Sequence, residues 1–275
     1  MRRIPSLENL AQPSRSRNEL ETAARFDRGT TVLTRMLACP YDVLMSRIHF
    51  IGGEKGGVGK SVVARVLAQW FIDKSIPFAA VDGELSQGAL IRYYSEFTQP
   101  VDLTAAESAD QIMDRALGAE RRVLVDLPAQ SARSLSSWMA GANVVEFAKE
   151  LGIGLTFWHV SDGGFASVAE IDRALRLFRH QLQHVVVKNF GRSKDFSQLD
   201  DSDAKRQLDE LAGRVLELPE LDASTMYRID RHGLSFWAAI HNSEGEATLK
   251  PLERQRVKLW LERCYAQLDL FDGAL

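Results

Sequence analysis

Residues 52–61, GGEKGGVGKS, decide the fold of this chain. They follow the apolar run RIHFI at 47–51 and precede the helical pattern KSVVARVLAQWFIDK at 60–74. A strand, a glycine turn and a helix that opens on Lys-Ser are the context of a phosphate-binding loop. Glycines let backbone N–H groups converge on phosphate oxygens, and the helix N-terminus adds partial positive charge. We therefore expect a nucleotide site here, and the alternative is a glycine turn that binds no ligand.

Two side chains of this loop have clear expected roles. Lys60 is expected to hold the β- and γ-phosphates as a point charge, and the Ser61 hydroxyl to complete the coordination of Mg²⁺. Glu54 stands where the standard loop has its first glycine, so Lys55 beside it needs its own explanation. The expected cofactor-binding residues are Gly56, Gly57, Val58, Gly59, Lys60 and Ser61.

Composition limits the classes of function. The chain has 275 residues, 45% apolar and 26% charged, which suits one large α/β domain or two small ones. A net charge of −3 gives no global reason to expect nucleic acid. There are only two cysteines, Cys39 and Cys264, in no Cys-x-x-Cys or Cys/His spacing, so we expect neither a disulfide framework nor a zinc site. Without a secretory signal or a long apolar run, we expect a cytoplasmic protein.

From Met45 onward, short apolar runs alternate with helical patterns, which indicates βαβ units. We predict a doubly wound, mostly parallel α/β sheet flanked by helices. The expected strands are 47–51, 78–82, 121–129, 154–160, 184–190 and 214–218, and the expected helices include 60–74, 165–182 and one from about Leu252. Residues 1–44 are predicted to form a weakly ordered extension, and residues 45–275 the nucleotide-binding domain.

The residues KGGVGKS at 55–61 match the deviant phosphate loop K-G-G-x-G-K-[ST]. They resemble the ParA/MinD family of ATPases, the SIMIBI class of P-loop NTPases. The resemblance implies ATP and Mg²⁺ as cofactors. It also implies that Lys55 crosses the interface of a nucleotide-sandwich homodimer and touches the partner's phosphates, a charge supplied in trans. The alternative for Lys55 is a solvated loop lysine.

The stretch VDGELSQGA at 81–89 resembles the family's D-x-D at the end of the second strand. Asp82 matches the first carboxylate and Glu84 the second, lengthened by one methylene. The resemblance implies that both orient the attacking water, and that Asp82 lies at the metal. Leu85-Ser86-Gln87 replaces the usual Pro-Gln, which leaves the rate of hydrolysis open, and Glu84 is alternatively an exposed loop acid.

Later motifs continue the resemblance. VLVDLPA at 123–129 resembles the D-x-P-[AP] of Walker B and switch II, which implies that Asp126 holds Mg²⁺ directly or through water. Asn189 follows a predicted strand where family members read the adenine edge, and Pro219 begins the loop expected to pack on the base. A turn asparagine is the alternative for Asn189.

These motifs predict an ATP-dependent dimerisation switch whose slow hydrolysis is stimulated by a protein partner. Its output is expected to be positioning of mobile-element DNA, bound without sequence preference, or of a conjugative-transfer complex. The candidate basic residues for DNA are Arg173, Arg176, Arg179, Arg192 and Lys194. The alternative that we favour for the three on the predicted helix is a solvated helix face. A MinD-like membrane role is an alternative, although the mixed charge of the C-terminal helix favours packing on the sheet. A dethiobiotin synthetase-like biosynthetic enzyme is the other alternative.

Overall fold

The computed structural model describes residues 46–53, 55–85, 88–118 and 121–271. All of them belong to one compact unit, residues 44–275. The predicted N-terminal extension lies outside the described residues, so it stays a prediction. Glu54, Ser86 and Gln87 of the sequence motifs also lie outside them.

Within the described residues a seven-stranded sheet has the order β3-β2-β4-β1-β5-β6-β7, and every neighbouring pair is parallel. All six predicted strands are present, and the predicted α/β fold class is confirmed. Sequence analysis missed β3, because a three-residue strand that ends in proline has no apolar run to reveal it. The strands are β1 (Arg47–Gly52), β2 (Phe78–Asp82), β3 (Thr98–Pro100), β4 (Arg122–Asp126), β5 (Gly154–Ser161), β6 (Gln183–Asn189) and β7 (Arg214–Leu218).

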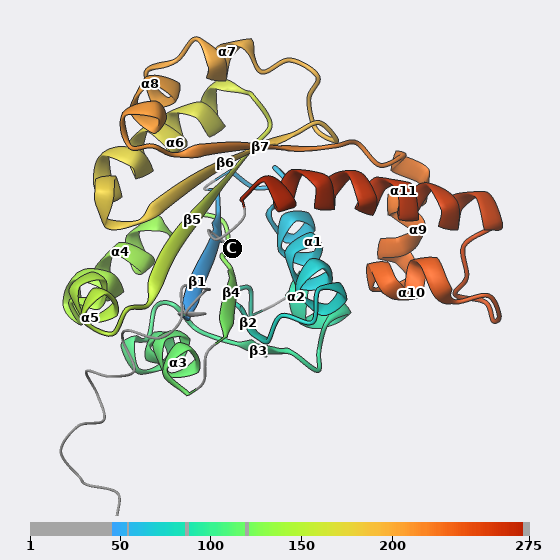
Figure 1. The fold of residues 1–275 in the computed structure, drawn as a ribbon, viewed down its shortest axis with the longest axis horizontal. Helices are drawn as coiled ribbons and strands as arrows, with labels where there is room; N and C mark the ends of the chain where they lie inside the picture. Colours follow the sequence, from blue (N-terminus) through green and yellow to red (C-terminus); the bar gives the residue numbers. More distant parts are fainter. Residues whose placement is uncertain (1–45, 54, 86–87, 119–120, 272–275) are drawn as a thin grey trace, which may run out of the picture. The chain divides into compact units, whose positions relative to one another are not determined.

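Helices cover both faces of the sheet (Figure 1). One face carries α1 (Lys60–Asp73), α2 (Ala89–Tyr93), α9 (Ala223–His232), α10 (Phe236–His241) and α11 (Pro251–Leu268). The other carries α3 (Ala106–Leu117), α4 (Ala132–Gly141), α5 (Val144–Glu150), α6 (Phe165–Phe178), α7 (Ser197–Asp200) and α8 (Asp203–Glu210). Two 3₁₀ turns, η3 (Arg179–Gln181) and η4 (Asp269–Phe271), follow α6 and α11.

Strand β1 lies at the centre of the sheet and is buried on both faces. Phe50 belongs to the apolar cluster under α3, α4 and α5, and Ile51 to the cluster under α1 and α11. Both side chains are fully buried, as are Ile48 and His49, which fits a central parallel strand covered by helices on both faces.

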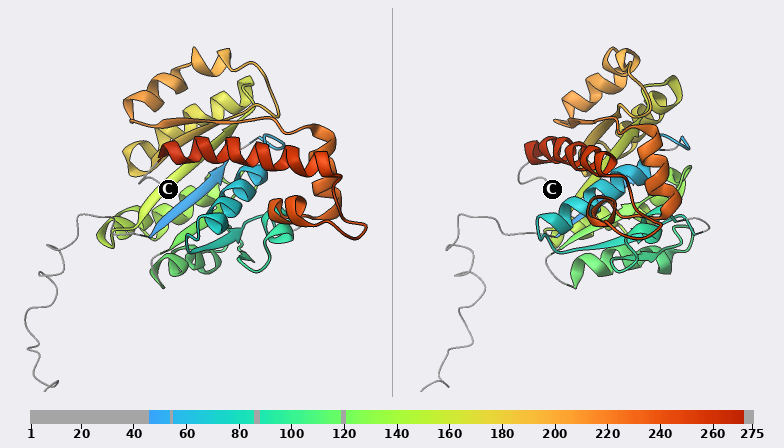
Figure 2. Two further views of the ribbon diagram at one scale, coloured as in Figure 1. Left: turned by 45° about the vertical axis from the view of Figure 1, so that its right-hand side comes forward. Right: turned by 90° about the vertical axis from the view of Figure 1, so that its right-hand side faces the viewer.

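The C-terminal helix α11 packs beside α1, as both views of Figure 2 show. The hydroxyl of Tyr265 donates to Asp73 Oδ2 at 2.7 Å, and Trp260 Nε1 donates to the carbonyl of Pro219 at 2.7 Å. Its apolar side chains Val257, Trp260, Leu261, Cys264 and Leu268 are buried. The predicted packing of this helix on the domain is confirmed. No helix in the described part of the chain is long and apolar enough to cross a bilayer.

The strand register brings the motif residues to one edge of the sheet. Ile51 near the end of β1 pairs with Asp126 at the end of β4, and Asp126 pairs with Asp82 at the end of β2. β1 lies between β4 and β5, so the crossover connections on its two sides diverge. In open α/β sheets, ligands bind outside the carboxyl ends of the strands at such a point.

Candidate functional site

The loop between β1 and α1 depends on its glycines. Gly57 and Gly59 have φ of +80° and +104°, a backbone region that side chains disfavour. A Cβ atom on Gly59 would also lie 2.2 Å from Nδ2 of Asn189. Gly56 and Gly57 are exposed, and a Cβ at either would meet no atom within 4 Å, whereas Val58 anchors the loop with a buried side chain. The backbone at Gly56 and Gly57 is thus accessible to a ligand, while the buried Val58 side chain fixes the loop to the domain.

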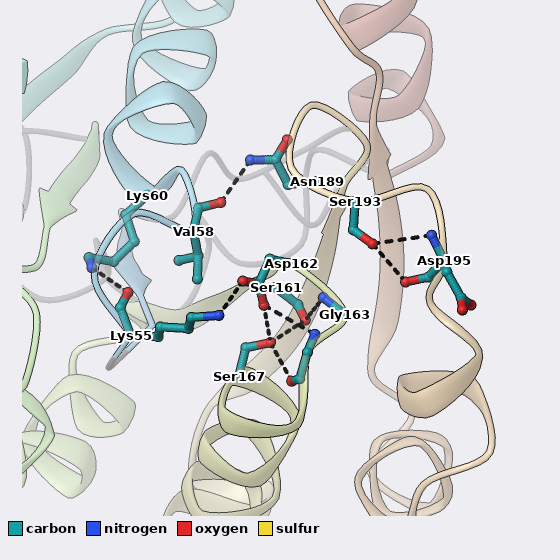
Figure 3. Close-up of polar contacts among 11 residues, drawn as sticks. Lys55, Val58, Lys60, Ser161, Asp162, Gly163, Ser167, Asn189, Ser193 and Asp195 are labelled. Carbon is teal, nitrogen blue, oxygen red and sulfur yellow. Dashed lines mark hydrogen bonds and ion pairs between the residues drawn. The ribbon is translucent and has the colours of Figure 1, made fainter.

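The side chains of Lys60 and Lys55 both extend from this loop, and each contacts a different group, as Figure 3 shows. Lys60 is the first residue of α1, and its Nζ lies 3.5 Å from the carbonyl oxygen of Lys55. The ammonium group of Lys55 donates to Oδ2 of Asp162 at 2.5 Å. Asp162 directly follows β5, so this ion pair joins the phosphate loop to the neighbouring strand end.

Asp162 also has fixed partners within its own loop. Its Oδ1 accepts hydrogen bonds from Gly164 N at 3.1 Å and Ser167 Oγ at 2.8 Å. Although burial raises it, hydrogen bonds from Lys55, Ser167 and Gly164 hold the pKa of Asp162 below its ordinary value. Sequence analysis missed this residue. The available signal was its position, because Asp162, like Asp82 and Asp126, is an acid at a strand's carboxyl end.

Asp126 is the most perturbed carboxylate of the site. It is 4% exposed, and the Ser61 hydroxyl hydrogen-bonds to its side chain. Burial, followed by the charge of Asp82, raises the pKa of Asp126 to about 7. Its Oδ1 is buried and has no hydrogen-bond partner among the described residues. An open, buried carboxylate oxygen beside a serine hydroxyl suits a hard divalent cation.

The donor set fits Mg²⁺ better than a metal held entirely by protein side chains. Among the described residues, no group of three or more His, Cys, Asp or Glu is arranged to hold a metal. Mg²⁺ keeps several waters and is usually bound through one or two carboxylates together with phosphate oxygens. Ser61 and Asp126 therefore fit the predicted cation, provided that a bound nucleotide supplies the remaining oxygens.

Asp82 makes a different set of contacts. Its Oδ1 accepts from Glu84 N at 3.0 Å, and its Oδ2 accepts from Leu90 N at 2.8 Å and Ile91 N at 3.1 Å. Burial raises the pKa of Asp82, although these backbone donors act in the opposite direction. The carboxylate thus joins the loop after β2 to the first turn of α2. Its predicted metal and catalytic roles stay predictions.

Glu84 lies at the same edge of the sheet. Its residue is exposed, and its charge contributes to the raised pKa values of both Asp82 and Asp126. Glu84 therefore acts electrostatically on both of these carboxylates. Its role in hydrolysis stays a prediction.

Asn189 and Pro219, the predicted base contacts, are placed by contacts within the protein. Asn189 is 5% exposed, and its Nδ2 donates to the carbonyl of Val58 at 2.7 Å (Figure 3). Its Oδ1 accepts from Gly191 N at 3.0 Å. The structure therefore brings Asn189 to the phosphate loop. Pro219 follows β7, and its carbonyl accepts the hydrogen bond from Trp260. Base contact by either residue stays a prediction.

The candidate basic residues are largely paired with acids. Arg173 forms an ion pair with Glu170 at 2.6 Å, and Arg176 with Asp172 at 2.9 Å. Lys194 pairs with Glu220. The exposed face of α6 therefore carries mixed charge, which offers a polyanion weaker attraction than a basic stripe does.

Three comparisons with known proteins were made, against family models, curated sequences and solved structures. No family model matches the chain. Two Escherichia coli proteins named Protein TraL are 23% identical over 239 residues and 25% identical over 242, each alignment covering 82% of this chain and 98% of the relative. The solved structure of the septum site-determining protein MinD complexed with Mg-ADP, from Pyrococcus horikoshii OT3, superposes with a TM-score of 0.53 and 16% identity. That likeness covers 84% of this chain and 98% of the other.

The likeness in structure shows that this chain shares its fold with that MinD protein, as the deviant loop at 55–61 predicted.

Proposed function

We propose that this protein is a ParA/MinD-type positioning ATPase that dimerises when it binds Mg²⁺ and ATP and separates after slow hydrolysis. The observation that carries the proposal is the arrangement around Asp126. A buried carboxylate with an open oxygen hydrogen-bonds to Ser61, in the first turn of the helix that follows the glycine loop. The shared MinD-like fold supports it.

In this proposal the loop backbone and Lys60 bind the phosphates, and Ser61 and Asp126 hold Mg²⁺. The cation, when bound, neutralises charge on the phosphate oxygens. Asp126 must be ionised to serve as a ligand, and a bound cation favours the ionised form. The helix N-terminus and Lys60 stabilise the same negative charge from the protein side.

The nucleotide state would be transmitted through the loops that follow β2 and β4. Gly83 N donates to the carbonyl of Asp126 at 2.9 Å, and Leu127 N donates to the carbonyl of Ile51 at 3.0 Å. Asp82 continues this chain of contacts to α2. A change at Asp126 therefore has a direct path to both loops, as a γ-phosphate switch requires.

Lys55 is proposed to act in trans. Its side chain is 42% exposed, and it extends from a loop whose outer backbone is also exposed. In a sandwich dimer it would bring positive charge to the partner's phosphates, where the transition state develops negative charge.

The proposed cargo is mobile-element DNA or a conjugative-transfer complex, and a protein partner is proposed to stimulate hydrolysis. The likeness to the two proteins named Protein TraL extends over nearly their whole length, which supports a function shared with those proteins. The paired arginines on α6 give less support to direct, non-specific DNA binding than to a protein cargo.

Gel filtration with light scattering tests the switch, with ATP and Mg²⁺ present or absent. The native chain is expected to dimerise only with ATP. Lys55→Ala is expected to bind ATP and stay monomeric, whereas Lys149→Ala, which removes an exposed lysine of α5, behaves like the native chain. A native chain that stays monomeric, or a Lys55→Ala chain that dimerises equally well, contradicts the proposal. Adding DNA or liposomes to the same samples distinguishes the ParA-like output from the MinD-like one.

A further inference from the structure

The ion pair between Lys55 and Asp162 has a geometry that the proposed trans role of Lys55 does not explain. Lys55 Nζ lies 2.5 Å from Asp162 Oδ2 within a single chain. A lysine that must reach a partner's phosphates cannot keep this contact as it extends. The ion pair must therefore break before Lys55 can reach the phosphates of a partner protomer.

Hydrogen bonds within its own loop fix the carboxylate of Asp162, and the long side chain of Lys55 reaches it. Gly163 N donates to Ser161 Oγ at 3.0 Å, and Gly164 N and Ser167 Oγ hold Oδ1 of Asp162. A Cβ atom on Gly164 would lie 3.7 Å from Lys55 Nζ, an ordinary contact distance, so the ammonium group lies against the backbone that holds Asp162. The loop before α6 thus presents Oδ2 toward Lys55 in a defined position, as Figure 3 shows.

A second acid lies close to Lys55 but is engaged elsewhere. Glu170 lines the same small cavity as Lys55, beside Phe157 and His159. Both of its carboxylate oxygens accept from Arg173 Nη1 at 2.6 Å. Asp162, whose Oδ2 receives Lys55, is therefore the acid that positions this lysine in the single chain.

Asp162 keeps a favourable environment when Lys55 leaves. Its carboxylate lies at the N-terminus of α6, where helices favour negative charge and disfavour a cation. Its bonds to Gly164 N and Ser167 Oγ do not involve the lysine. Release of Lys55 therefore costs one partly exposed ion pair and leaves the other hydrogen bonds of Asp162 intact.

We propose that Asp162 is a positioning residue that holds Lys55 inside its own chain and so raises the threshold for ATP-dependent dimerisation. This inference rests on the proposed trans role of Lys55. Each protomer of a dimer gives up one such pair. A pair of this exposure shifts an equilibrium constant by about two- to fivefold, so two pairs shift it by about four- to twenty-fivefold.

The variant Asp162→Asn isolates the charge, because the amide retains an oxygen to accept from Gly164 N and Ser167 Oγ. Asp195→Asn is the matched control. Asp195 lies in the loop that packs against Gly163, and its Oδ1 accepts from Ser197 N at 2.9 Å. Both variants remove one negative charge from the same part of the surface, and Asp162→Asn alone removes the acceptor of Lys55.

The first measurement is the reactivity of Lys55 in the nucleotide-free full chain. An amine-acetylating reagent is applied, and the extent of modification at Lys55 is read by peptide mass spectrometry. We expect Asp162→Asn to raise modification of Lys55 several-fold, and Asp195→Asn to leave it unchanged. This readout does not require dimerisation, and equal modification in all three chains overturns the inference.

The second measurement is the dimer dissociation constant at saturating ATP and Mg²⁺. Asp162→Asn is expected to dimerise about four- to twenty-fivefold more tightly than the native chain, with unchanged affinity of the monomer for ATP. A native chain that dimerises while Asp162→Asn dimerises equally or more weakly overturns the inference alone. A native chain that stays monomeric overturns the proposed function, and the inference with it.

Discussion

The ends of β4 and β2 carry the same residue in the same register and use it differently. Asp126 and Asp82 pair across the two strands, and both are buried, at 4% and 1% exposure. Asp82 accepts three backbone hydrogen bonds, whereas Asp126 has an oxygen without a partner among the described residues. We call a strand end closed when the protein's own groups fill the hydrogen-bonding positions of its polar side chain, and open when one oxygen lacks a partner. A closed end organises a loop, and an open end is available to a ligand.

The end of β6 resembles the end of β2 in this respect. Asn189 donates to the phosphate loop at Val58 and accepts from Gly191, so both ends of its amide are engaged. The comparison therefore separates one open strand end, at Asp126, from two closed ones. Replacing each residue in turn tests that division.

The largest expected effect is on hydrolysis in Asp126→Asn. Loss of the charged ligand weakens the hold on the cation that neutralises the phosphates, so we expect kcat to fall by about 100-fold or more. Phosphate release at saturating ATP and Mg²⁺ measures it, with circular dichroism as the check on folding. Hydrolysis at the native rate would remove Asp126 from the metal site.

The open carboxylate also predicts a pH dependence of stability without nucleotide. The pKa of Asp126 is about 7 in the fold against an ordinary 3.8, so the folded state binds the proton more tightly. The free energy of unfolding from this group is fully present below pH 3.8 and declines as the pH rises through 7. The loss is of the order of 2–4 kcal/mol. Urea unfolding from pH 4 to 8 should show it in the native chain and not in Asp126→Asn.

Asp82→Asn is expected to act on the fold instead. An amide offers one acceptor oxygen to three backbone donors, and its own N–H group faces at least one of them. We expect the free energy of unfolding to fall by about 1–3 kcal/mol. Amide hydrogen exchange should increase at residues 84, 90 and 91. If Asp82→Asn is as stable as the native chain, the end of β2 is not closed in the way described.

Asn189→Ala is expected to lower stability, as Asp82→Asn does, because it removes hydrogen bonds within the protein. Losing the bond to Val58 loosens the phosphate loop, and we expect about 1 kcal/mol less stability. Affinities for ATP and GTP should fall by the same factor, because both ends of the Asn189 amide bond to backbone groups of the protein, Val58 O and Gly191 N. Calorimetric titration with both nucleotides measures this. A loss confined to ATP would show instead that Asn189 reads the adenine.

Glu84→Gln is expected to have the smallest effect. The charge of Glu84 contributes to the raised pKa of Asp126, so its removal should move the pH midpoint of Mg²⁺-dependent ADP binding slightly lower. Titrations with ADP avoid any change in hydrolysis. An unchanged or higher midpoint would show that Glu84 acts too weakly on Asp126 to tune cation binding.

Much of the fold was predictable because its signals are local. Six of the strands and the helices at 60–74 and 165–182 follow from runs and periods within single segments. β3 was missed because TQP has no such signal. For the site, motif spacing gave the candidates Lys60, Ser61, Asp82 and Asp126, and the parallel register places Asp82 and Asp126 at one edge of the sheet, while the roles of all four stay predictions.

The sequence by itself determined the chemistry of this edge: a glycine loop, two lysines and acids at the ends of neighbouring strands. Tertiary structure decided which partner each group has. Asp126 keeps an oxygen without a partner among the described residues, and Asp82 accepts from the backbone of α2. Asn189 donates to Val58, and Asp162 accepts from Lys55, 107 residues away in sequence. Motif spacing constrains residues within one segment, whereas these partners come from loops that meet only when the sheet is assembled.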